Sequence, residues 1–231
     1  MELKLWFSFL LLHVIHAQSS KGQWSANVPT KIPVLQGSCV VIPCIYNYPK
    51  PTSKRPLSRW RGFWMNNKKK VVSTNLPKWK LSEEYKKRTQ FLGDLKARNC
   101  TMLLDGVRNS DVGPFYFRIE MPQYRSFSYK KYPVTIDVKR EPEPPSLSVE
   151  VNDKVTASCS VSHSCPTIPP QISWSQSGFI TRRSKRLNSW KWETVSTLIF
   201  LPRPRDFNRP LNCTVRYRGG KLVTSSTILR V

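Results

Sequence analysis

Three residues at fixed intervals constrain the fold of this chain more than any other feature of its sequence. Cys159 is followed 15 residues later by Trp174 and 54 residues later by Cys213. Each lies in a short segment where polar and apolar residues alternate, which is the period of a half-buried β-strand. A cysteine pair at this distance, with a tryptophan between its members, is typical of two packed β-sheets joined by a disulfide. The second half of the chain is therefore predicted to be a β-sandwich.

The first half contains a related but altered pattern. Residues 111–118 read Asp-Val-Gly-Pro-Phe-Tyr-Phe-Arg, which is typical of the start of strand F in a variable-type immunoglobulin domain. That strand normally carries a cysteine where this chain has Phe117. If the phenylalanines of this segment fill the core, strand alternation places Tyr116, Arg118 and Glu120 on the outer face. We therefore expect an outward-facing arginine on this strand.

Strand parity separates the roles of the six cysteines. Residues 38–46 are predicted to form one strand, in which Cys44 faces the core and Cys39 faces the opposite side. Because position 117 holds no cysteine, the remaining partner for Cys44 within this half is Cys100, which predicts a bridge within one sheet. Cys39 then remains to join the two halves. The predicted bridges are Cys44–Cys100, Cys39–Cys165 and Cys159–Cys213.

The predicted fold class is all-β, with two tandem immunoglobulin-like β-sandwiches, V-set then C2-set, joined by an interdomain disulfide. Residues 140–145 are charged and rich in proline, so they cannot continue a central strand and are predicted to be a short linker. They separate a V-set domain at residues 18–139 from a C2-type domain at residues 146–231. The last strand is expected at residues 223–231.

The N-terminus has the pattern of a secretory signal peptide. Lys4 supplies a positive charge, residues 5–12 are apolar, and Ala17 ends a cleavage motif, which predicts a signal peptide at residues 1–17. The apolar run is shorter than the roughly 20 residues of a membrane span, and no later segment is apolar enough to cross a bilayer. The chain is expected to be extracellular. It is secreted, or it lies at the plasma membrane surface as the N-terminal part of a longer, membrane-anchored parent.

The balance of charges favours anionic partners. The chain has 38 basic and 14 acidic residues, for a formal net charge of +24. Because an exported chain rarely meets nucleic acid, the expected partners are sialylated or sulphated glycans and acidic cell surfaces. The basic runs at residues 68–70, 86–88 and 182–186 are interpreted as solvated surface, with a heparin-type patch as the alternative.

A shortage of histidine excludes several function classes. His163 is the single histidine of the predicted mature chain, and no Cys-x-x-Cys motif occurs. A zinc site therefore lacks ligands, and a nucleophile–base pair cannot be assembled once the cysteines are paired. We predict that the chain is not an enzyme and binds no metal or cofactor.

The assembled motifs resemble the sialoadhesin family, the sialic-acid-binding immunoglobulin-like lectins or siglecs. The resemblance covers nearly the whole mature chain, and the two closely spaced cysteines at 39 and 44, together with the strand F arginine, are specific features that immunoglobulin domains in general do not share. The family's intrasheet, interdomain and conventional disulfides agree with the parity prediction. The matching segments are residues 22–24, 37–44, 92–94, 98–101, 115–118, 159–161, 164–166 and 169–174.

The resemblance implies a sugar-binding role for Arg118. A guanidinium is a planar fork that meets a carboxylate with two hydrogen bonds and stays charged, so Arg118 would bind the sialic acid carboxylate. Trp24 would pack on the sugar's acetyl group, and strand G would offer main-chain hydrogen bonds and one aromatic contact. The alternative for Arg118 is an ordinary surface ion pair with Glu120. The implied sialic-acid-binding residues are Arg118, Trp24, Tyr124, Ser126, Phe127 and Ser128.

The resemblance thus implies a cell-surface lectin that binds terminal sialic acid on glycoproteins or gangliosides in cell adhesion and recognition. The alternative is an immunoglobulin-type receptor ectodomain that binds a protein or a heparin-like ligand through its basic surface. Asn99 and Asn212 each begin an N-glycosylation sequon, so both are predicted to be modified.

Overall fold

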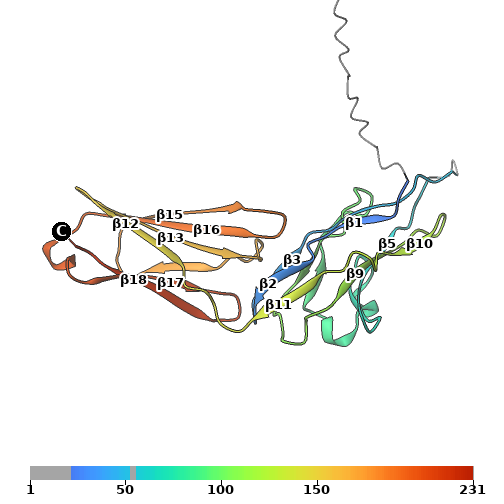
Figure 1. The fold of residues 1–231 in the computed structure, drawn as a ribbon, viewed down its shortest axis with the longest axis horizontal. Helices are drawn as coiled ribbons and strands as arrows, with labels where there is room; N and C mark the ends of the chain where they lie inside the picture. The colour runs from blue at the N-terminus through green and yellow to red at the C-terminus, as the bar shows by residue number, and fades with distance from the viewer. Residues whose placement is uncertain (1–21, 53–55, 231) are drawn as a thin grey trace, which may run out of the picture.

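The computed structural model describes residues 22–52 and 56–230, so the predicted signal peptide lies outside the described residues. The described chain consists of strands and three short 3-10 helices, arranged as two sandwiches placed end to end (Figure 1). This arrangement confirms the prediction of an all-β protein with two immunoglobulin-like domains. Within the described ranges, no helix is long and apolar enough to cross a membrane.

The first domain has two layers. One is the four-stranded sheet β10-β9-β5-β6, and the facing layer combines β3-β8-β7 with β1-β4. Strand β11 pairs in parallel with β2. Because β9 lies inside the four-stranded sheet, strands on both sides hold it. The elements are β1 (Ser25–Asn27), β2 (Lys31–Leu35), β3 (Val40–Ile42), β4 (Ile45–Asn47), β5 (Arg61–Asn66), β6 (Val71–Thr74), η1 (Lys78–Lys80), η2 (Glu83–Tyr85), β7 (Thr89–Phe91), β8 (Met102–Leu104), β9 (Phe115–Glu120), β10 (Ser126–Ser128) and β11 (Thr135–Lys139).

The prediction of one strand over residues 38–46 was wrong. Strand β3 pairs with β8, whereas β4 pairs with β1. The chain changes partner at Pro43, which has no N–H to donate to a continuous ladder. Cys44 still faces the core, where its side chain is fully buried.

Phe117 fills the position of the missing strand F cysteine. Its side chain is buried, and its ring centroid lies 5.1 Å from that of Tyr46 and 5.8 Å from that of Tyr129. Room for the ring comes from Gly62 on the neighbouring strand, because a Cβ there would lie 3.1 Å from the Phe117 ring and 3.0 Å from Leu95. The core beneath β9 is therefore built from aromatic rings rather than around a disulfide.

The second domain packs the sheet β12-β13-β16-β15 against the sheet β14-β17-β18. Its last strand ends at Ile228, three residues before the predicted end, and Val231 lies outside the described residues. Strand β15 contains the basic run at residues 182–186 that was predicted to be solvated surface, and all its residues are exposed. The elements are β12 (Ser146–Val151), β13 (Val155–His163), β14 (Gln171–Trp174), β15 (Phe179–Arg186), β16 (Trp192–Phe200), η3 (Pro204–Asp206), β17 (Pro210–Arg216) and β18 (Leu222–Ile228).

The disulfides follow the predicted plan. The bridge between Cys39 and Cys165, with Cα atoms 5.3 Å apart, joins the two domains. The structure also contains a bridge inside each domain, and no free cysteine occurs among the described residues. The Cα–Cα distances are 4.9 Å for Cys44–Cys100 and 6.4 Å for Cys159–Cys213.

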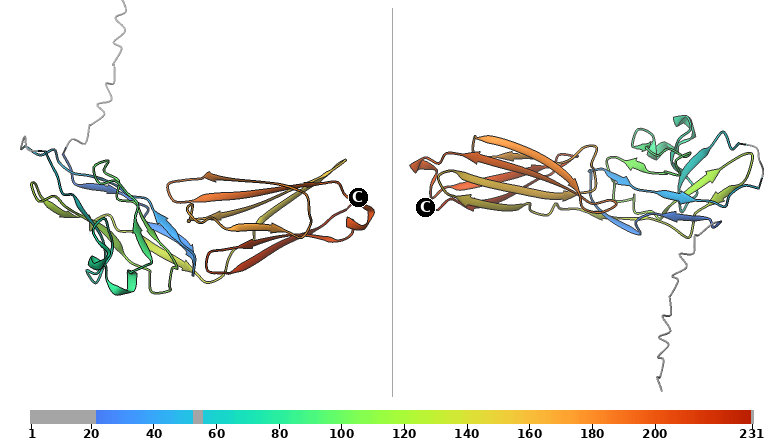
Figure 2. Two further views of the ribbon diagram at one scale, coloured as in Figure 1. Left: turned by 180° about the vertical axis from the view of Figure 1, so that it is seen from behind. Right: turned by 90° about the horizontal axis from the view of Figure 1, so that it is seen from above.

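The two sandwiches meet at their ends, as two further views show (Figure 2). Next to the interdomain bridge, Val41 N–H donates to the Ser164 carbonyl at 2.9 Å. On the other side of the junction, a Cβ on Gly219, whose φ is +94°, would lie 2.7 Å from the Gly37 carbonyl oxygen. Close backbone approach and a covalent bridge thus fix the second domain against the first.

Candidate functional site

Arg118 lies on the outer face of the four-stranded sheet. It pairs across the ladder with Phe63 of β5 on one side and Ser128 of β10 on the other. Residues that pair directly share a face of the sheet, so these three side chains form one row. The next row along the strands consists of Arg61, Glu120 and Ser126.

Tyr116, which was expected to face outward, is only 9% exposed. It belongs to the outer face by alternation, but two long side chains cover it. Met65 pairs with it across the ladder, and the Lys130 ammonium lies 5.8 Å from its ring centroid. The open part of the face therefore begins at Arg118.

The guanidinium of Arg118 is held by its two neighbours on the sheet. Nε and Nη2 donate to Glu120 Oε1 at 3.1 and 3.0 Å, and Nη1 donates to Ser128 Oγ at 3.0 Å. The ion pair with Glu120 that the sequence offered as an alternative is therefore present. A guanidinium has five N–H donors, so these contacts leave one hydrogen on each Nη nitrogen. With a side chain that is 34% exposed, Arg118 can present this pair to a further carboxylate.

Strand β10 adds main-chain donors beside Arg118. Tyr129 N–H donates to the Phe117 carbonyl at 2.8 Å, and Met121 N–H donates to the Arg125 carbonyl at 3.0 Å. Because bonding alternates along an antiparallel ladder, the N–H groups of Ser126 and Ser128 point to the outer edge of β10. No described strand pairs with that edge. A ligand on Arg118 would find unpaired backbone groups there.

The three predicted aromatic residues form a stack next to the same strand. The Trp24 ring lies 4.5 Å from Phe127 and 6.1 Å from Tyr124, with an interplanar angle of 15° to each. The Tyr124 hydroxyl donates to the Pro49 carbonyl at 3.1 Å. Phe127 pairs with Ile119, so it points to the inner side of the sheet, away from Ser128. The six predicted residues thus form a polar group and an aromatic group on the two faces of β10.

Two buried tyrosines support the aromatic group from below. Burial raises the pKa of both Tyr46 and Tyr129 above the ordinary range, so both hydroxyls stay protonated and can donate. The Tyr46 hydroxyl donates to the Leu95 carbonyl at 2.6 Å, and the Tyr129 hydroxyl donates to the Asn47 carbonyl at 2.8 Å. Trp24 and Phe127 pack against the Tyr129 ring, with centroids 6.2 and 5.0 Å away, and the Tyr46 ring packs against Tyr129 in turn.

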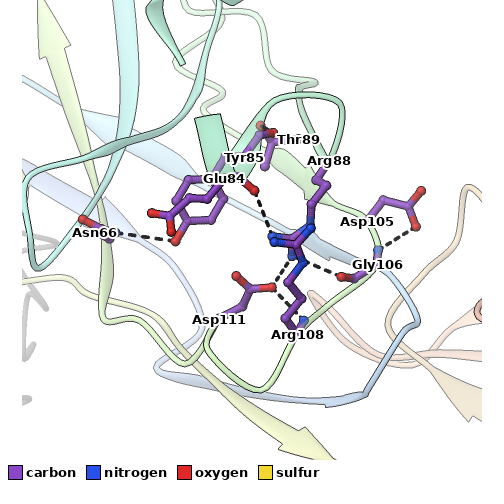
Figure 3. A network of polar contacts seen from close by, with 9 residues as sticks. All are labelled: Asn66, Glu84, Tyr85, Arg88, Thr89, Asp105, Gly106, Arg108 and Asp111. Atoms are coloured by element: carbon purple, nitrogen blue, oxygen red, sulfur yellow. Dashed lines mark hydrogen bonds and ion pairs between the residues drawn. The ribbon is translucent and has the colours of Figure 1, made fainter. Parts of the chain in front are cut away.

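The loop that leads into β9 is anchored by a buried ion pair (Figure 3). Arg88 Nη2 contacts Asp111, whose side chain is 3% exposed, and also donates to the Gly106 carbonyl at 3.1 Å. Asp111 also accepts from Arg108 N–H at 2.7 Å. Nearby Asp105 pairs with Arg218 of the second domain, and this hydrogen bond lowers the pKa of the Asp105 carboxyl. The network fixes the start of β9 and links it to the domain junction.

Comparison with known proteins gives a family match for each of the two domains. Residues 34–139 match the family described as B-cell receptor CD22-like, first Ig-like, and residues 140–221 match the CD80-like C2-set immunoglobulin domain. Human sialic acid-binding Ig-like lectin 5 is 27% identical, covering 90% of this chain and 38% of the relative. Human myelin-associated glycoprotein is 28% identical, covering 90% and 34%. The resemblance to the sialoadhesin family is confirmed.

The siglec-like chain spans about a third to about half of the length of such relatives. Mouse myeloid cell surface antigen CD33, 27% identical, is covered over 55% of its length and covers 95% of this chain. Among solved structures, bovine butyrophilin shares 15% identity, with coverage of 90% of this chain and 99% of that one. Its TM-score of 0.39 adds nothing to the assignment.

Sequence reasoning missed two neighbours of Arg118 in this siglec-like domain. Phe63 and Arg61 come from β5, and only the cross-strand register brings them beside β9. The alternation of residues 61–66 around the buried Trp64 was the available signal, because it places Phe63 on the outer face. The predicted absence of a metal site stays a prediction, although the described ranges contain no cluster of three potential metal ligands.

The two sequon asparagines are half-buried and hydrogen-bonded. Asn99 Oδ1 accepts from Thr101 N–H at 2.9 Å, and Asn212 Oδ1 accepts from Ser226 Oγ at 2.6 Å. In both cases the hydrogen bond is made by the side-chain oxygen and not by the amide nitrogen, where a glycan would be attached. Modification at either site stays a prediction.

Proposed function

We propose that this chain is the sugar-binding part of a lectin that recognises terminal sialic acid on glycoproteins or gangliosides, with Arg118 contacting the carboxylate. The supporting observation is the guanidinium on an exposed sheet face, whose own contacts leave one hydrogen on each Nη nitrogen. A carboxylate can accept both at once in the bidentate geometry that makes such pairs strong.

The surroundings of Arg118 suit the rest of a sugar. Hydroxyl groups of Ser126 and Ser128 and the open edge of β10 offer hydrogen bonds, and Phe63 offers an apolar surface in the same row. The Trp24 stack lies on the opposite face of the same edge strand, so it would contact the acetyl and glycerol parts of a sugar that reaches over the open edge of β10. The relatives named for sialic acid binding support the same ligand class.

One sugar on an exposed arginine should bind weakly, with a dissociation constant near the millimolar range, about −4 kcal/mol. Adhesion would then require many copies that engage clustered glycans at once. The chain would act outside the cell, as part of a longer protein held at the plasma membrane or as a secreted form. The predicted signal peptide supports this location.

The test uses the chain displayed in many copies, with binding measured to cells before and after sialidase treatment. Arg118→Ala should abolish the sialidase-sensitive binding, because a charge-assisted contact contributes about 1.5–3 kcal/mol, roughly a 10- to 150-fold change in affinity. Arg118→Lys keeps the charge but not the fork, so binding should be intermediate. Thermal unfolding of each variant then tests whether it is folded.

The competing function is a receptor ectodomain that binds a protein or heparin-like ligand through its basic surface. Reversing the charges at Lys68, Lys69 and Lys70 provides the control, because this exposed run lies on the β5–β6 turn. If sialidase-sensitive binding survives Arg118→Ala but disappears with the reversed lysines, the lectin proposal is wrong.

A further inference from the structure

Strand β15 is exposed along its whole length, from Phe179 to Arg186. It forms one edge of the sheet β12-β13-β16-β15, and the only described strand that pairs with it is β16 (Figure 1). One side of its backbone is therefore open to solvent.

Four cations lie within five consecutive residues of this strand. Arg183 and Lys185 point to the outer face of the sheet with Val195 and Glu193, whereas Arg182 and Arg186 alternate to the other face. Lys185 pairs with Glu193 at 2.9 Å. Among the described residues, no carboxylate lies within ion-pair distance of the three arginines.

Two of these arginines are already ordered by carbonyl groups. Arg182 Nη2 donates to the Ile172 carbonyl at 3.3 Å, and Arg186 donates to the carbonyls of Asn188 and Ser189 at 2.8 and 2.9 Å. Such contacts hold the side chain but leave its positive charge uncompensated. A ligand that binds them loses less side-chain entropy than it would on free surface arginines.

Protection of a free sheet edge does not explain this charge. Charged residues on edge strands commonly prevent strands of different molecules from pairing. The other three edge strands of this domain, β12, β14 and β18, carry one charged residue between them, Glu150. If edge protection required four cations on β15, the other three edge strands would not lack them.

We propose that β15 is a second binding site, which takes a linear sulphated polysaccharide of the glycosaminoglycan class. At about 3.3 Å per residue, Arg182 and Arg186 lie roughly 13 Å apart along the strand, a length that suits a polymer with repeated anionic groups. A row of hydroxyls from Thr181, Thr197 and Ser158 crosses the sheet beside Arg183 and can bond to the sugar rings. Cations on both faces of the strand match a chain that carries sulphates on both sides.

The test measures binding of the intact chain to immobilised heparin oligosaccharides by surface plasmon resonance over a series of salt concentrations. The variant Arg183→Ser with Lys185→Ser removes two charges from the outer face. The control Lys154→Ser with Arg205→Ser removes one lysine and one arginine from exposed positions of the same domain. A conservative exchange, Arg183→Lys with Lys185→Arg, tests the same positions without loss of charge.

We expect the β15 variant to lose at least tenfold in affinity and the control less than threefold. The slope of log affinity against log salt should fall in the β15 variant by about 1.5, if each cation releases counterions as it does on nucleic acids. The conservative exchange should keep the binding. Arg118→Ala should leave heparin binding unchanged, so this site and the sialic acid site can fail separately.

Three results would overturn the proposal. One is no heparin binding by the unaltered chain at physiological salt. The second is an equal loss in the control, which would mean that the total charge alone governs binding. The third is equally tight binding of poly-glutamate or of desulphated heparin, because the site would then accept an acidic peptide or a sugar without sulphates.

Discussion

Replacing Glu120 by glutamine should strengthen, not weaken, the binding of a sialylated ligand. Glu120 Oε1 accepts two hydrogen bonds from Arg118, and an amide oxygen at the same position can accept them too. What the substitution removes is a negative charge next to the ligand's carboxylate. The guanidinium stays oriented, and the repulsion between two carboxylates that share it disappears.

The size of the effect follows from the geometry of the pair. Carboxylates on two edges of one guanidinium lie about 6 Å apart, where their repulsion is roughly 0.7 kcal/mol in water and roughly 3 kcal/mol at an effective dielectric constant of 20. The side chains of Arg118 and Glu120 are 34% and 30% exposed, so the repulsion energy between the two carboxylates should lie near the aqueous limit. About 1 kcal/mol corresponds to roughly fivefold tighter binding.

Nuclear magnetic resonance titration with a sialylated trisaccharide at low and high salt measures this gain directly. The fivefold improvement should appear at about 0.05 M salt and shrink at about 0.5 M, where charges this far apart are screened. Glu84→Gln is the matched control, because Glu84 also pairs with a base, Lys70, at 3.2 Å. Equal or weaker binding by the Glu120 variant at low salt would refute the reasoning.

Two further predictions concern the domain junction. Replacing Cys39 and Cys165 by alanine should lower the free energy of unfolding of the whole chain by about 4–5 kcal/mol, given a separation of 126 residues. An unchanged melting temperature would contradict this. Burial lowers the pKa of His163 to about 4, below the unfolded value near 6.5. The unfolded chain therefore binds the extra proton, so stability falls as the pH drops from 6.5 to 4, by on the order of 2 kcal/mol after discounting for the exposed part of the ring. Urea unfolding at pH 7 and 4.5 should show a smaller loss in His163→Gln, and equal losses in both proteins would argue against the prediction.

The covalent framework could be predicted because it depends on parity and spacing alone. A cysteine on the core side of a strand can form a disulfide only with another cysteine that reaches the same core. Position 117 holds a phenylalanine, so Cys44 had to pair elsewhere. The predicted pairing survived even though the strand breaks at Pro43, because Cys44 keeps its direction through the carbonyl that accepts from Cys100 N–H at 2.8 Å. Local errors in strand length therefore did not change the disulfide plan.

Burial and cross-strand neighbours could not be predicted in the same way. Tyr116 has the correct parity for the outer face, yet Met65 of β5 and Lys130, which follows β10, cover it. Strand β15 was missed because its sequence is charged and alternates poorly, and only its pairing with β16 makes it a strand. In both cases the deciding partner lies on another segment of the chain, and the sequence alone does not show the register that brings the two together.

The position of Arg118 depends on non-covalent contacts alone. In a variable domain with a strand F cysteine, the disulfide would tie this strand to the facing sheet. Here the bridge joins Cys44 to Cys100, just before β8, so no covalent bond holds β9. Its place is set by the ladders to β5 and β10, by the packing of Phe117 against Gly62, and by the Asp111 ion pair at its start. Substitutions at Gly62 or Asp111 should therefore disturb ligand binding at Arg118 although neither residue lies on the outer face.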